Sequence, residues 1–121
     1  MEFSDVIKNR YSCKKFSSEQ IGKDKLDAIL EAGRVAPTAK NLQEQHIYVV
    51  QSESALETID KLTPCRYNAP TVLIVAYNKN NVFTYLGDKR NSGIEDATIV
   101  ATHLMLAAYL SLIHISEPTR H

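Results

Sequence analysis

The chain alternates between two patterns of apolar residues, one typical of helices and one typical of strands. Spacings of three and four residues predict four helices: Phe3–Asn9, Lys23–Val35, Ser54–Lys61 and Ile94–Leu110. Short β-branched runs predict two buried strands, Ile47–Val50 and Thr71–Tyr77. The spacing of Ser54 and Glu57 predicts a capping box at the start of the third helix. Helices before, between and after the strands indicate an α+β or three-layer α/β fold.

The last predicted helix, Ile94–Leu110, is apolar on almost every side. A helix of this kind lies at the centre of a core or inside a subunit interface. His103 stands within it, and a lone histidine in such a place is expected to be a hydrogen-bonded core residue rather than a catalyst.

The composition limits the classes of function. At 121 residues the chain is at most one domain, and its 14 basic and 14 acidic residues cancel. Without a general field for nucleic acid or an anionic membrane, any anion site must be local. No apolar run approaches the roughly 20 residues of a membrane span, and the start of the chain lacks the features of a signal peptide. The sequence therefore predicts a cytoplasmic protein that binds neither nucleic acid nor a membrane.

The two cysteines, Cys13 and Cys65, predict no special chemistry. They are too few and too far apart for a zinc site, so no metal is expected. A cytoplasmic location argues against a disulfide. Basic neighbours favour a thiolate at Cys13, but the sequence offers no evident partner base. Both are expected to be free thiols, and no catalytic side chain is assigned.

The segment Arg10–Phe16, here called the basic segment, is the first candidate for binding chemistry. In an extended backbone alternate side chains share a face, so Arg10, Ser12 and Lys14 are expected to point the same way. A guanidinium, a hydroxyl and an ammonium are the groups that hold a phosphate. The alternative is a solvated strand edge on which lysine blocks unwanted pairing.

A second candidate follows Pro37, in the stretch Thr38–Gln45, here called the amide loop. It is small and polar and has neither helical nor strand periodicity. The side-chain amides of Asn41 and Gln43 can both donate and accept hydrogen bonds, which suits recognition of the edge of a flat heterocycle.

Together these stretches resemble the nitroreductase family of FMN-dependent oxidoreductases. The basic segment is similar to the family's opening Arg-x-Ser-x-Arg/Lys-x-Phe, and Ala36–Gln43 is similar to its Ala-Pro-Ser/Thr-x-x-Asn-x-Gln. Asp96 with Leu104–Ala108 resembles its central interface helix. The departures are Glu44 and Gln45, where many members carry Pro and Trp, and Ile47, where Phe is usual; they leave the substrate open.

The resemblance implies a three-layer α/β/α sandwich and a homodimer through the helix 94–110 that holds FMN at the subunit interface. NAD(P)H would reduce the flavin, which would reduce a nitroaromatic, a quinone or a similar small acceptor. The residues implied at the cofactor site are Arg10, Tyr11, Ser12, Lys14, Asn41 and Gln43. Since the flavin does the chemistry, no side chain needs to be a general acid or base.

The end of the chain, Ser111–His121, departs from the helical pattern and looks like translated read-through of a sequencing adapter. We therefore expect residues 1–110 to be the N-terminal part of a flavin-binding domain, residues 111–121 to be a non-native tail, and the chain as written to be inactive. Two alternatives remain open from the sequence: a flavin- or phosphate-binding module without turnover, and a structural fragment without a ligand. A nucleic-acid-binding module is the weakest reading because the net charge is zero.

Overall fold

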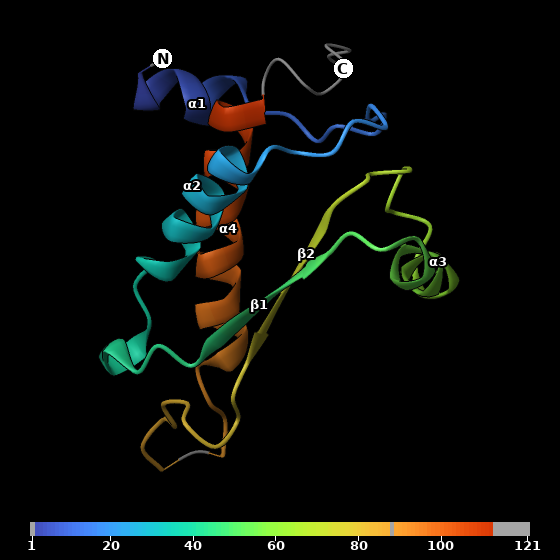
Figure 1. Ribbon diagram of the computed structural model, residues 1–121. Coiled ribbons are helices and arrows are strands. Elements are labelled where there is room, and N and C mark those ends of the chain that lie inside the picture. Colours follow the sequence, from blue (N-terminus) through green and yellow to red (C-terminus); the bar gives the residue numbers. More distant parts are fainter. Residues whose placement is uncertain (1, 88, 113–121) are drawn as a thin grey trace.

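The computed structural model describes residues 2–87 and 89–112 and confirms an α+β chain. Its elements, in order, are α1 (Phe3–Asn9), α2 (Lys23–Arg34), the 3₁₀ turn η1 (Ala39–Asn41), β1 (Gln45–Val50), α3 (Glu53–Leu62), β2 (Val72–Tyr77) and α4 (Gly93–Leu112). Every predicted helix and strand is present, with boundaries within two residues of those expected. Figure 1 shows α4 as the central rod, with α2 along one side and the two strands crossing it.

The core lies where α2 meets α4. Ile29 of α2 and Val100 and Leu104 of α4 are 0–5% exposed and pack together with Ala36. Gly33 allows this close approach, because a Cβ at its position would lie 2.7 Å from Leu104 Cδ2. The absence of a side chain on α2 therefore sets the distance between the two helices.

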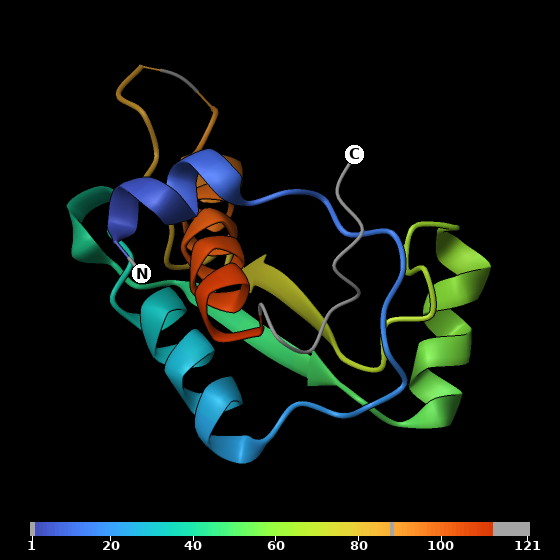
Figure 2. The same ribbon diagram turned by 90° about the horizontal axis from the view of Figure 1, so that it is seen from above.

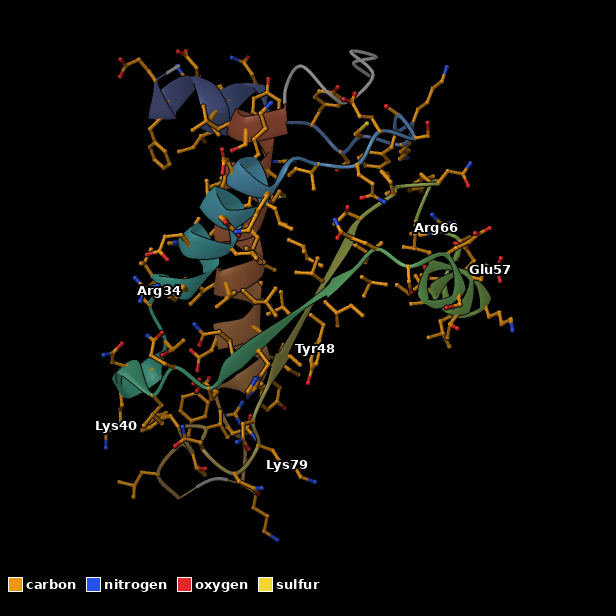
Figure 3. All side chains as sticks on the ribbon, in the orientation of Figure 1. Arg34, Lys40, Tyr48, Glu57, Arg66 and Lys79 are labelled. Carbon is orange, nitrogen blue, oxygen red and sulfur yellow. The ribbon has the colours of Figure 1, made fainter. Side chains whose placement is uncertain are left out.

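The two strands form an antiparallel ribbon, in register from Gln45 opposite Tyr77 to Val50 opposite Val72. One face of the ribbon packs on the core, whereas Tyr48 is 58% exposed on the other face (Figure 3). The prediction of buried strands is therefore wrong for this face. The physical reason is that, within the described residues, helices cover the ribbon in a single layer (Figures 1 and 2).

The cap of α3 differs from the predicted capping box. Ser52, which has extended backbone angles, is the N-cap, and its hydroxyl oxygen accepts a hydrogen bond from the Ala55 N–H at 3.3 Å. Ser54 lies inside the helix and cannot cap it, because a capping residue needs a non-helical backbone.

The long helix carries His103 as expected. Its Nδ1 lies 3.3 Å from the carbonyl oxygen of Ala32, and the side chain is half-buried. The helix runs through Leu112, so the boundary expected between residues 110 and 111 falls within it. The rest of the expected tail, residues 113–121, lies outside the described residues. None of the helices in the described ranges is long and apolar enough to cross a membrane.

Candidate flavin-binding site

The basic segment crosses the C-terminal end of α4 without forming a strand. Arg10 closes α1, and its backbone N–H donates to the Val6 carbonyl at 3.0 Å. The ring of Tyr11 meets the ring of Tyr109 edge to face, with centroids 6.3 Å apart and planes at 82°. The ring contact places the segment at the C-terminal end of the long helix.

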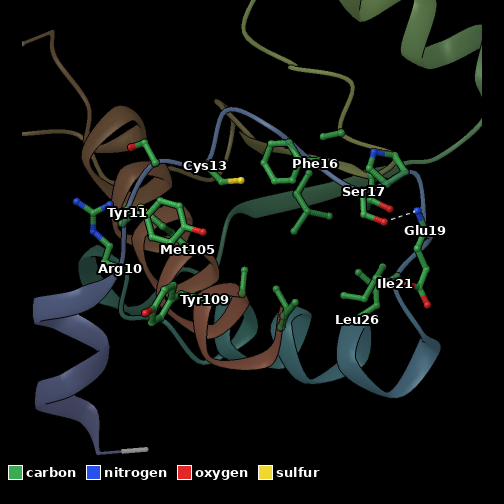
Figure 4. Close-up of a pocket in the computed structure, with 17 residues that line it drawn as sticks. Arg10, Tyr11, Cys13, Phe16, Ser17, Glu19, Ile21, Leu26, Met105 and Tyr109 are labelled. Carbon is green, nitrogen blue, oxygen red and sulfur yellow. Dashed lines mark hydrogen bonds between the residues drawn. The ribbon is translucent and has the colours of Figure 1, made fainter. Parts of the chain in front are cut away.

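A cavity of about 370 Å³ lies between the basic segment, α2, α4 and β2 (Figure 4). Its lining is mainly apolar and includes Phe16, Ile21, Leu26, Met105 and Tyr109. The four consecutive residues Arg10–Cys13 all border it, whereas Lys14 does not and is exposed. The predicted alternation, with Arg10, Ser12 and Lys14 on one face, therefore does not describe which residues of this segment border the cavity.

The donors of the basic segment fit an anion. Arg10 can donate two parallel hydrogen bonds, and the exposed Ser12 and Lys14 add a hydroxyl and an ammonium on the same short stretch. The thiol of Cys13 donates to the Lys15 carbonyl at 2.9 Å, so this sulfur already has a structural partner. Both cysteines are free.

The amide loop has an unusual backbone. Lys40, Asn41 and Gln43 all have a φ of 54°, in the left-handed region that residues other than glycine rarely adopt. The Gln43 N–H donates to the Thr38 hydroxyl at 3.0 Å, and the Gln43 side-chain amide donates to Asn41 Oδ1 at 2.6 Å. The structure thus brings both predicted amides together, on the exposed side of the loop. Strain of this kind persists where the surroundings hold it, often at ligand sites.

The amide loop is tied to the other end of the long helix. The Ala39 N–H donates to Asp96 Oδ1 at 3.0 Å, and Asp96 lies in the first turn of α4. The Asn81 side chain adds a hydrogen bond to the Leu42 carbonyl at 3.3 Å.

Two buried acids support this loop, and no sequence pattern pairs them. Glu44 is 2% exposed and Asp96 is 3% exposed. Burial, and then a hydrogen bond with Asp96, raise the pKa of Glu44. Burial alone would raise the pKa of Asp96, but the neighbouring Glu44 carboxyl and the hydrogen bonds from the Ser92 hydroxyl and the Ala39 N–H lower it. The available signal was Glu44 itself, a charged residue directly before an apolar strand.

The two candidate halves of the site therefore lie at opposite ends of α4 (Figure 1). Tyr109 holds the basic segment and Asp96 holds the amide loop. At 1.5 Å per helical residue, these two anchors are about 20 Å apart. One copy of the described chain does not bring the predicted phosphate donors and the predicted amides to a common pocket.

Comparison with known proteins agrees with this architecture. A model of the nitroreductase family matches residues 7–67. A nitroreductase family protein of Clostridium difficile 630 shares 33% identity, with a TM-score of 0.84 over 89% of this chain and 62% of that one. A Bacteroides fragilis nitroreductase solved with bound FMN shares 26% identity, with a TM-score of 0.74 over 89% of this chain and 64% of its own.

A curated protein of Methanothermobacter thermautotrophicus, which carries the name NADH dehydrogenase/NAD(P)H nitroreductase, is 26% identical over 112 residues. The match covers 90% of this chain and 56% of that protein. The chain thus spans little more than half the length of this relative.

Proposed function

Because the chain belongs to the nitroreductase family, we propose that it forms part of an FMN-dependent oxidoreductase that takes hydride from NAD(P)H. The electrons go on to a nitroaromatic, a quinone or a similar small acceptor. A bound flavin supplies the redox chemistry, and the protein supplies binding, orientation and exclusion of water.

The separation of the two half-sites along α4 is the observation that carries this proposal. In a homodimer whose two-fold axis is perpendicular to α4, the two α4 helices run in opposite directions. The end that holds the basic segment in one copy then meets the end that holds the amide loop in the other. A complete site consequently contains the basic segment of one subunit and the amide loop of its partner.

Each half-site has a distinct binding role in this arrangement. Arg10, Ser12 and Lys14 hold the phosphate and the adjoining ribityl hydroxyls, with Tyr11 beside them. Asn41 and Gln43 present their amides to the polar edge of the isoalloxazine ring. Their mutual hydrogen bond orients both amides before the cofactor arrives, which lowers the entropy lost on binding.

The exposed surface of α4 supports self-association. A shallow apolar groove runs between α4 and β2, lined in part by Val75, Ala97, Ala101 and Met105. Ile94, which also lines the groove, is 72% exposed. Exposed apolar side chains that gather along a long helix are typical of an interface between subunits.

Mixed dimers provide the test. Arg10→Ala damages the basic segment and Asn41→Ala damages the amide loop, so each homodimer has two damaged sites. If every site draws on both subunits, mixed dimers hold one intact site, and random 1:1 mixing restores about a quarter of the wild-type number of sites. The two variants are made in the full reading frame that contains the chain and are unfolded and refolded together. The readouts are flavin binding and NAD(P)H oxidation.

The same experiment has a contrary outcome. If both half-sites act within one subunit, the mixture contains no intact site, and activity stays at the level of the separate variants. Matched mixtures of each variant with wild-type protein control for losses during refolding.

A further inference from the structure

Beneath the amide loop, the carboxyl groups of Glu44 and Asp96 are both shielded from water, and each shifts the pKa of the other. Asp96 accepts hydrogen bonds from the Ala39 N–H at 3.0 Å and from the Ser92 hydroxyl at 2.7 Å. Neither side-chain oxygen of Glu44 has a hydrogen-bond donor within the described residues. Two ionised carboxylates in such a place would repel each other at low dielectric, so one of the two must hold a proton.

The surroundings assign that proton to Glu44. Asp96 lies in the first turn of α4, where the helix dipole favours a negative charge, and it already has two donors. Glu44 has neither advantage. A proton on the Glu44 carboxyl supplies the missing donor and makes the contact with Asp96 attractive.

Among the residues that the structure describes, nearby cations do not replace this proton. Lys40 and Lys79 are exposed and point outward at the lower end of the molecule in Figure 3. Lys40 lies 5.9 Å from the centre of the Phe83 ring, and Arg90, also exposed, lies at the same distance from the Tyr85 ring. The next titratable group on the strand, His46, is exposed as well.

The pair connects the two ends of the amide loop. At the start of the loop, Asp96 holds the Ala39 N–H. At its end, the backbone carbonyl of Glu44 accepts from the Asn78 N–H at 2.9 Å. The left-handed residues lie between these two anchors. A bond between the two carboxyl groups therefore closes the loop across its base.

We propose that Glu44 is a positioning residue: as a neutral carboxylic acid, its O–H donates a hydrogen bond to the Asp96 carboxylate and so fixes the amide loop on the start of α4. It touches neither cofactor nor substrate. This proposal rests on the proposed function only in what it says Asn41 and Gln43 bind. The role of Glu44 in the loop does not depend on it, because the conformation of the loop can be measured without any cofactor.

The first test compares wild type with Glu44→Gln and Glu44→Leu in the full reading frame that contains the chain. The side-chain amide that Glu44→Gln introduces can still donate to Asp96 but cannot titrate, whereas Glu44→Leu fills the space without a donor. We expect the Ala39 N–H to exchange with solvent as slowly in Glu44→Gln as in wild type, and about tenfold or more faster in Glu44→Leu. Equal exchange in all three proteins would overturn the proposal.

The second test is spectroscopic and needs no flavin. Wild type at neutral pH should show the infrared band of a buried protonated carboxylic acid, and Glu44→Gln should lack it. Absence of that band from folded wild-type protein overturns the proposal, even if Glu44→Leu does not fold. If the wild-type protein shows the carboxylic acid band but binds no FMN, the proposed function is wrong and the role of Glu44 stands.

The pH dependence has a defined sign. The pKa of Glu44 is raised above its ordinary value of 4.5, so the folded state binds more protons than the unfolded state. This contribution to the free energy of unfolding is complete below pH 4.5 and is lost as the pH rises through the folded-state pKa. The stability of wild type relative to Glu44→Gln should therefore fall with rising pH, and a difference independent of pH would contradict the proposal.

Discussion

The rings of Tyr11 and Tyr109 meet edge to face, with centroids 6.3 Å apart. This contact joins the beginning of the described chain to the end of its longest helix, and it fixes where the basic segment leaves α1. Edge-to-face aromatic pairs contribute about 0.5–1.5 kcal/mol beyond the area that they bury. The position of the candidate phosphate donors thus depends on a residue far away in the sequence.

Replacing Arg10 by Ala should weaken FMN binding in the full reading frame that contains the chain. A charge-assisted hydrogen bond contributes about 1.5–3 kcal/mol, which corresponds to a loss of affinity of roughly 10- to 150-fold. The matched control is Lys15→Ala, which removes an exposed cation from the same segment. Titration with FMN measures both, and a change of less than about twofold for Arg10→Ala would count against its assignment.

A charge placed on α4 where the helix lines the apolar groove beside β2 should prevent self-association without unfolding the chain. Ala101 is exposed beside β2, so Ala101→Glu should give a folded monomer, as measured by sedimentation velocity and circular dichroism. Leu62→Glu on α3, at a residue that is 81% exposed, is the control and should leave the dimer intact. Val100 and Leu104 are unsuitable for this purpose, because both lie in the core and an aspartate there would unfold the chain.

Adding one methyl group at Gly33 should destabilise the protein. Its Cβ would lie 2.7 Å from Leu104 Cδ2 and 2.9 Å from Ile47 Cδ1, so α2 and α4 would have to move apart. Overpacking of this kind costs about 1–3 kcal/mol, although alanine is normally the better helix former. At Gly22 the added methyl group meets no atom within 4 Å, so Gly22→Ala should cost less in the same denaturant titration. An equal or larger loss at Gly22 would contradict the packing argument.

The free energy of unfolding should depend on pH through Asp60 of α3, which pairs with Arg66 in the loop after that helix. Arg66 donates to both carboxylate oxygens of Asp60, at 2.7 and 2.6 Å, and lowers the pKa of Asp60 below 3.8. The folded state then binds fewer protons, so this stabilisation is present above pH 3.8 and is lost as the pH falls through the folded-state pKa. Asp60→Asn should be less stable than wild type at neutral pH, and the difference should close in acid.

Glu57→Gln, on the same helix (Figure 3), removes a charge without this partner and serves as the control. A gap between wild type and Asp60→Asn that stays constant down to the acid limit would show that Arg66 does not hold Asp60 in solution.

We expect the 121-residue chain alone to bind no FMN. Bound cofactors are usually buried over most of their surface, and the described residues offer two separated half-sites with the ribbon covered on one face. Absorbance of the purified protein and its oxidation of NAD(P)H measure this directly. A yellow protein with turnover would refute it, and a yellow protein without turnover would support a binding module.

The elements could be predicted because their signals are local. The spacing of Leu26 and Ile29 predicts α2 without knowledge of its partner, and the β-branched run after His46 can only be a strand. The cap of α3 could not be predicted with the same certainty, since Ser52 and Ser54 have the same chemistry and only the backbone distinguishes them.

The site was less predictable because its groups meet through tertiary structure. The contact of Glu44 with Asp96 joins residues that are distant in sequence, and no spacing rule connects them. Likewise, the basic segment and the amide loop both resemble motifs of one family, but that resemblance does not reveal that they lie at opposite ends of α4.

The contact between Ala32 and His103 has a kinetic consequence, because it joins residues 71 positions apart. On the ribosome, α2 emerges long before α4, the helix that covers its apolar stripe. At about 5–20 residues per second, that stripe waits roughly 4–14 s for its partner. The apolar stripe of α2 therefore stays uncovered for that time, and this core can form only after α4 has left the exit tunnel.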